Sequence, residues 1–115
     1  MTTFLGRYDE VDDHIISLVA HGADVRVVRA GRDKISVLDG FASALDLPTW
    51  FGRNWDALLD ALRELSTDER RRLELVWDQT HELREAAPET YATVIDILEQ
   101  VADERDDLGV TVVDR

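Results

Sequence analysis

The sequence LPTWFGRNWDALLDAL, residues 47–62, carries the clearest structural pattern in the chain. Its second half predicts a helix that begins near Asn54, because an asparagine side chain can accept a hydrogen bond from a free backbone N–H at a helix start. Apolar residues then recur at one-turn spacing, which is typical of a helix with one buried face. Pro48 ends a preceding helix, so the residues between Pro48 and Gly52 are expected to form a loop.

Outward from this segment, short apolar strands alternate with helices. Apolar and β-branched runs predict strands at residues 25–29, 73–77 and 110–113. Helical spacing predicts helices over residues 12–20, 37–45 and 81–86, and a longer one from Pro88 to a stop at Gly109. The first eight residues are compatible with a tail or a short strand. This order predicts an α/β fold with a small three-stranded parallel sheet packed by helices.

The length and composition of the chain are those of one acidic domain without cysteine. The chain has 115 residues, enough for one modest core, and a net charge of −12. Nucleic acid and anionic membranes would repel such a surface, whereas a basic protein partner would complement it. Solubility is the other explanation of the charge. Because the acidic start is no secretion signal and no long apolar run follows, a cytoplasmic protein is expected.

Asp56 and Asp60 lie four residues apart and therefore share one face of the predicted helix. They could form a solvated face, with Asp60 paired to Arg63, or a contact surface for a basic partner. A pair of catalytic carboxylates is the third interpretation. It lacks support, because no nucleophile, phosphate-binding loop or metal-ligand spacing accompanies the two aspartates. No catalytic residue, cofactor or metal is expected.

The aromatic side chains fall into two groups. Trp55 and Trp77 lie on apolar faces and are expected in the core. Phe51, in the loop, is expected to cover the core. Trp50, in the same loop, could equally cover the core or contact a partner. Tryptophan is favoured at protein interfaces, which supports the second possibility.

The segment LDLPTWFGRNWDALLDAL, residues 45–62, resembles the signature of the barstar family of intracellular ribonuclease inhibitors. The shared features are a leucine–proline helix end, an aromatic pair, Gly52, Asn54, and an Asp-Ala-Leu run followed by a second aspartate. The order of elements agrees over roughly residues 25–113. The resemblance implies a barstar-like domain at residues 25–115. It leaves residues 1–24 as an N-terminal extension, with a short helix packed on the same domain.

In function, the resemblance implies one-to-one binding to a basic extracellular ribonuclease, whose active site the acidic helix and the preceding loop would block. The alternative is an immunity protein against a different basic toxin. The free protein is expected to be a monomer that binds neither nucleic acid nor membrane. The implied partner-binding residues are Trp50, Gly52, Asn54, Asp56, Leu59, Asp60, Glu99 and Gln100.

Three features depart from the family pattern. Leu59 stands where the family often has a tryptophan, and Arg53 replaces an acidic residue common in this turn. The arginines at residues 70–72 would oppose a basic enzyme unless they point away. A further family acid on the long helix aligns nearest to Glu99 or Gln100.

Overall fold

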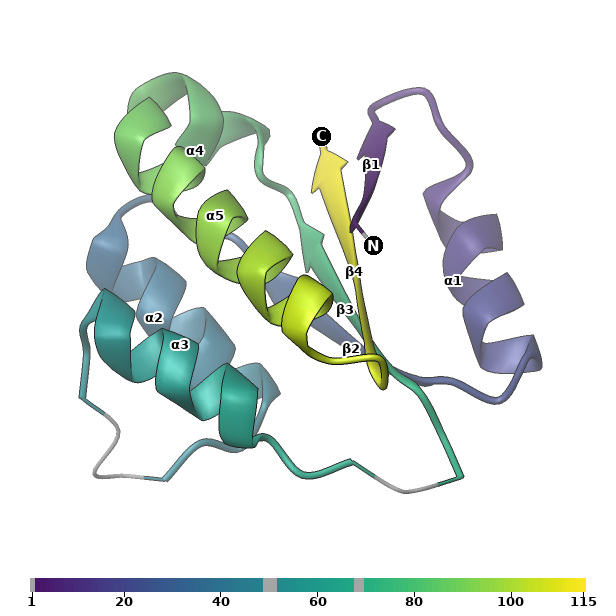
Figure 1. Ribbon diagram of the computed structural model, residues 1–115. Coiled ribbons are helices and arrows are strands. Elements are labelled where there is room, and N and C mark those ends of the chain that lie inside the picture. The colour runs from purple at the N-terminus through teal and green to yellow at the C-terminus, as the bar shows by residue number, and fades with distance from the viewer. Residues whose placement is uncertain (1, 49–51, 68–69) are drawn as a thin grey trace.

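The computed structural model describes residues 2–48, 52–67 and 70–115, and contains one sheet with helices on both faces (Figure 1). Its elements in chain order are β1 (Thr2–Gly6), α1 (Val11–Ala20), β2 (Asp24–Arg29), α2 (Lys34–Ala44), α3 (Trp55–Glu64), β3 (Leu73–Asp78), α4 (His81–Ala86), α5 (Pro88–Glu104) and β4 (Leu108–Asp114). The predicted α/β fold with a parallel sheet is confirmed, and α4 has the predicted bounds.

The sheet has four parallel strands in the order β1-β4-β3-β2, rather than the three predicted. The added strand is β1, which pairs with β4 from Thr2 opposite Val110 to Gly6 opposite Asp114. A five-residue strand carries too little periodicity to be distinguished from a tail by pattern alone. Its hydrogen-bonding partner lies at the far end of the chain, beyond the reach of local signals.

Alternating side chains of the inner strands point into two separate apolar layers. Leu75 and Trp77 of β3 belong to the main core, to which α2, α3 and α5 contribute. Val76, between them, belongs to a smaller cluster with Val11 of α1 and Val113 of β4. In Figure 1, α1 lies on the opposite side of the sheet from the other helices. Every residue of β3 is buried because both faces of this strand are covered.

Local capping sets the start of two helices. Asn54 caps α3 as predicted, since its Oδ1 accepts a hydrogen bond from the N–H of Ala57 at 2.8 Å. Helix α2 begins at Lys34, earlier than the predicted start at residue 37. The reason is a reciprocal capping box between Asp33 and Ser36, which satisfies backbone N–H groups at the helix start.

Gly109 does not end the C-terminal helix, contrary to the prediction. Helix α5 ends at Glu104, and Gly109 is the second residue of β4, paired with Glu74 of β3. The Glu74 carboxylate occupies the space that a side chain at residue 109 would need. The glycine therefore allows close packing within the sheet rather than a turn.

Gly40 brings α2 against the end of β2. A β-carbon at this position would lie 2.8 Å from the carbonyl oxygen of Arg29, a backbone atom that cannot rotate away. We expect Gly40→Ala to lower the free energy of unfolding by about 1–3 kcal/mol, because overpacking against the backbone outweighs the better helix propensity of alanine. Urea denaturation measures this, with Ser43→Ala on the exposed face of α2 as the control. Unchanged stability of Gly40→Ala would contradict the prediction.

Candidate partner-binding site

A groove lies between the end of α2 and one face of α3. Its volume is about 580 Å³, and both apolar and acidic side chains line it. The lining residues, which define what we call the α2–α3 groove, are Leu45, Asp46, Leu47, Pro48, Gly52, Ala57, Asp60, Ala61, Glu64, Leu65 and Ser66.

Four carboxylates make this surface acidic. Asp60 and Glu64, one turn apart on α3, line the groove together with Asp46. Asp56 is exposed one turn before Asp60, so the predicted pair does share one face. Within residues 2–48, 52–67 and 70–115, none of these four carboxylates has a side-chain hydrogen bond or ion pair.

Asp46 was not among the residues predicted from the sequence. It has a positive φ of 53° directly after α2, which turns the chain towards Pro48. Aspartate tolerates this left-handed conformation better than most residues. The position of this aspartate, between the end of a helix and a proline, could therefore have predicted the turn and the residue from the sequence.

The loop before α3 contributes Gly52 and Asn54, both of which are exposed. The Asn54 Oδ1 already accepts the capping hydrogen bond, so its Nδ2 group is the donor that remains for a partner. A β-carbon on Gly52 would lie 3.4 Å from this Nδ2, and glycine thus leaves the amide more accessible. Trp50 and Phe51 lie outside the described residues.

The other predicted residues differ in exposure. Leu59 is half-buried and packs against the main core. Glu99 and Gln100 are exposed on α5. Trp55 lies at the edge of the core rather than within it, and Lys34 Nζ is 5.3 Å from the centre of its ring. By contrast, Trp77 is fully buried, as predicted.

Arg63 joins α3 to α5 and does not pair with Asp60. Its Nε and Nη2 donate to the two oxygens of Glu104, both at 2.8 Å, and Gln100 Nε2 donates to the same carboxylate at 3.3 Å. The Asp60–Arg63 pair, which was one of the alternatives for this face, does not form, because Glu104 offers two parallel charge-assisted bonds across the helix interface. These bonds hold the pKa of Glu104 below its ordinary value. Arg63 attracts Asp60 only from a distance, without a hydrogen bond or ion pair between them.

Arginines whose charge would oppose a basic partner are held within the protein. Arg53 Nε donates to Asp39 Oδ1 at 2.7 Å. Arg71 donates to two backbone carbonyl oxygens in the turn before β2, at 3.2 and 3.1 Å. Arg72 Nε donates to Glu74 Oε1 at 2.8 Å. These contacts tie Arg71 and Arg72 to the start of β2 and β3 rather than to the α2–α3 groove.

No metal centre is present in the described part of the chain, where no three or more His, Asp or Glu side chains are placed to hold an ion. Each histidine is hydrogen-bonded inside the protein instead: His14 to Thr111, His21 to the Ser17 carbonyl and His81 to Asp114. Of the helices described, none is long and apolar enough to cross a membrane.

The acidic α3 and its capping asparagine fall within one segment that matches a known protein family. A family model described as barstar (barnase inhibitor) matches residues 25–113. The chain belongs to the barstar family. The match includes the whole α2–α3 groove and leaves β1 and α1 outside it. Since barstar is described as an inhibitor, membership of the family favours a binding protein over an enzyme. A comparison with curated proteins gave no match.

Asp107 joins the segment after α5 to the loop after α3. Hydrogen bonds from Arg105 and from Thr67 Oγ1 lower the pKa of Asp107 from 3.8 to about 2. Because the folded-state pKa lies below the unfolded value, this contribution to stability is present above about pH 4 and is lost as the pH falls through about 2.

We therefore expect the parent protein to be more stable than Asp107→Asn at neutral pH, and the difference to shrink between about pH 4 and pH 2. Urea denaturation of both proteins at several pH values measures the difference directly, and other acidic groups cancel in the comparison. A difference that stays constant with pH would show that the carboxylate charge of Asp107 contributes nothing.

Proposed function

We propose that this protein inhibits a basic ribonuclease by placing α3 and the loop before it in the active site of the enzyme. The observation that carries the proposal is a set of carboxylates on and beside α3 that form no ion pair in the described part of the chain: Asp46, Asp56, Asp60 and Glu64. Like charges four residues apart on a helix repel each other, and cations of a partner would relieve that repulsion. A ribonuclease must hold RNA phosphates with cationic side chains, so its active site is such a partner.

Each residue has a proposed role in this complex. Asp56 and Asp60 take the positions of RNA phosphates and accept charge-assisted hydrogen bonds. Asn54 donates through its free Nδ2, and Gly52 allows the backbone to approach the enzyme closely. Trp50 stacks on the enzyme surface, as the family resemblance implies. Further contacts come from Leu59, Glu99 and Gln100.

The proposal includes one-to-one binding by a monomer in the cytoplasm. One acidic surface faces one cationic active site, so the complex needs no second copy of either protein. The net charge of −12 also favours rapid association with a basic enzyme, since long-range attraction steers the two proteins together.

An immunity protein against a different basic toxin is the second candidate. Leu59 favours it, because a half-buried leucine offers a partner less contact area than the tryptophan common at this position in the family. The same carboxylates would then bind cations that take no part in RNA cleavage.

Titration calorimetry against a basic secreted ribonuclease from the same genome tests the proposal. We expect one-to-one binding that blocks RNA hydrolysis and weakens with salt, because the Debye length falls from about 8 Å at physiological ionic strength to about 3 Å at 1 M. Salt-independent binding would contradict an electrostatic mode. Binding to a basic toxin without ribonuclease activity, and to no ribonuclease, would favour the second candidate.

A further inference from the structure

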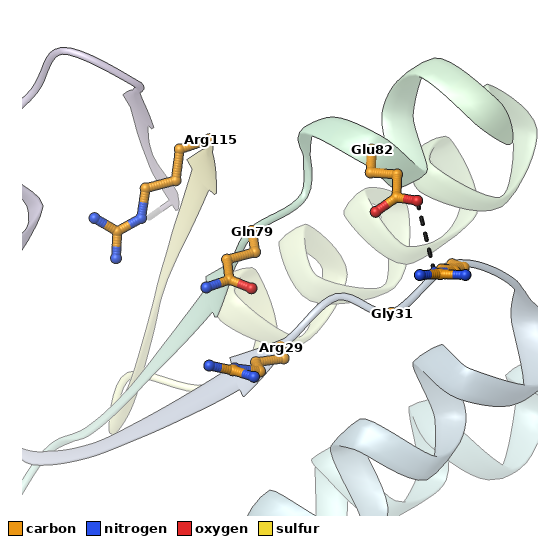
Figure 2. A pocket seen from close by; sticks show the side chains of 6 residues that line it. Arg29, Gly31, Gln79, Glu82 and Arg115 are labelled. Atoms are coloured by element: carbon orange, nitrogen blue, oxygen red, sulfur yellow. Dashed lines mark ion pairs between the residues drawn. The ribbon is translucent and has the colours of Figure 1, made fainter.

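A second pocket lies at the carboxyl ends of the strands and shares no residue with the α2–α3 groove. Its volume is about 670 Å³. The lining residues, which define the carboxyl-edge pocket, are Arg29, Gly31, Arg32, Gln79, Glu82 and Arg115 (Figure 2). Three arginines around one pocket are notable because the chain as a whole has a net charge of −12.

The pocket is built from residues at the ends of three parallel strands. Arg29 is the last residue of β2, and Gln79 follows β3, the strand that pairs with β2. The helices that come next, α2 and α4, lie on the same side of the sheet (Figure 1). In open α/β sheets, ligand sites lie outside the carboxyl ends of the strands. Arg115 follows β4 at this position.

Arg115 and Arg29 present donors on the same side of the pocket. Arg115 donates through Nε and Nη2 to the buried carboxylate of Asp78, at 3.0 and 2.9 Å, which fixes the direction of its guanidinium. Arg29 is the register partner of Asp78 across β2 and β3. Figure 2 shows Arg29, Gln79 and Arg115 extending their polar ends towards one side, away from Glu82.

Part of this positive charge has no fixed partner. Arg29 has no ion pair or side-chain hydrogen bond within the described ranges. Arg32 is only loosely paired, since its Nε lies 3.6 Å from Glu82 Oε1 and the two side chains are 84% and 69% exposed. An ion pair this exposed contributes little free energy, so Arg32 can exchange Glu82 for another anion. The carboxylates that act on these arginines are Glu82, the buried Asp78, and Asp12 of α1, which attracts Arg115 from outside the pocket lining. Arg29 is thus the arginine of the pocket whose charge no carboxylate among the described residues pairs.

The backbone around the pocket is turned in an uncommon way. Gly31 has a φ of 78° and Gln79 a φ of 58°, the left-handed region that costs energy for any residue except glycine. Gln79 nevertheless keeps an exposed side-chain amide, and its backbone N–H donates to Asp78 Oδ1 at 2.7 Å. The strained turn therefore places an additional donor beside the arginines.

We propose that the carboxyl-edge pocket binds the phosphate group of a small molecule. A phosphate offers several acceptor oxygens and a double negative charge, which match the planar donor forks of arginine. Arg29 supplies charge that no described carboxylate pairs, and Arg32 can exchange its exposed contact with Glu82 for the phosphate. Arg115 is held in place by Asp78, and the Gln79 amide donates a further hydrogen bond. Because long-range repulsion by the acidic surface is screened beyond about 8 Å at physiological salt, these local donors dominate within the pocket.

Backbone-amide NMR spectra during titration with inorganic phosphate, at constant ionic strength with chloride as the background anion, test the proposal. We expect saturable shifts of the Gly31, Arg32 and Gln79 amides. Arg29→Gln should weaken the apparent affinity by about tenfold or more, because one charge-assisted contact is lost. Arg26→Gln, three residues earlier on the same strand and outside the pocket lining, is the matched control and should leave the affinity unchanged. Shifts that do not saturate, or equal affinity in Arg29→Gln, would overturn the proposal.

Two further titrations distinguish the source of the phosphate. Adenosine monophosphate that binds more tightly than inorganic phosphate would identify a phosphate ester as the ligand, and equal affinity would identify the free ion. Adenosine without phosphate should not bind. If adenosine binds as well as its monophosphate, phosphate recognition is wrong.

Discussion

Replacing Asp60 with alanine is expected to weaken ribonuclease binding by about 3–5 kcal/mol, or at least about 100-fold. Asp60 lines the α2–α3 groove and forms no ion pair with another described residue, because Arg63 binds the carboxylate of Glu104. In the proposed complex its carboxylate is buried against enzyme cations. Removing it leaves those cations desolvated and unpaired, which costs more than the loss of an exposed ion pair. Titration calorimetry and inhibition of RNA hydrolysis measure the loss.

Asp13→Ala is the matched control for Asp60→Ala. Asp13 is an exposed aspartate on α1, the helix on the other face of the sheet, so its removal changes the net charge equally but spares the site. We expect Asp13→Ala to change binding by less than about threefold, because a remote surface charge acts mainly through screened steering. Equal losses in the two variants would show that net charge, and not Asp60, governs binding.

Replacing Trp77 with alanine is expected to lower the free energy of unfolding by about 3–5 kcal/mol. Trp77 is 1% exposed at the centre of the sheet, with its ring 6.2 Å from Phe41 and 5.7 Å from Tyr91. Its removal leaves a cavity under both α2 and α5, which the rigid sheet cannot close. For a domain of this size the loss is a large fraction of the total stability. Urea denaturation measures it.

Two variants sharpen this test. Trp55→Ala should cost clearly less than Trp77→Ala, because Trp55 is only half-buried at the edge of the core. Trp77→Phe should also cost less, since it retains most of the ring and removes the buried indole Nε1, which has no hydrogen-bond partner among the described residues. If Trp77→Ala were no more destabilising than Trp55→Ala, the placement of Trp77 at the centre of the core would be wrong.

The helices and inner strands were predictable because their signals are local. Asn54 caps α3 by accepting a hydrogen bond from the N–H of Ala57, only three residues later. Pro88 is favoured in the first turn of α5, the helix in which it stands. Strand β3 is buried on both faces, so its sequence is a short apolar run without alternation. The acidic face of Asp56 and Asp60 was predictable for the same reason, since helical periodicity alone places residues four apart side by side.

The candidate site was predicted only in part, because burial and pairing depend on neighbours in space. Arg63 stands three residues after Asp60 in the sequence, yet Glu104 of α5 binds it. Asp46 enters the α2–α3 groove through the left-handed turn after α2. Leu59 lies on the apolar side of α3, but its half-burial reflects how closely that helix packs on the core.

Periodicity and capping in this chain thus specify which segments are helices and strands, and which helix carries the acidic face. Packing between distant segments set the remainder. It made β1 the fourth strand, beside residues at the opposite end of the chain, and placed Gly109 under the Glu74 carboxylate. It also gathered three arginines at the carboxyl edge from sequence positions 29, 32 and 115. Such contacts form between residues that share no local pattern, because the free energy that joins them appears only when the whole sheet has assembled.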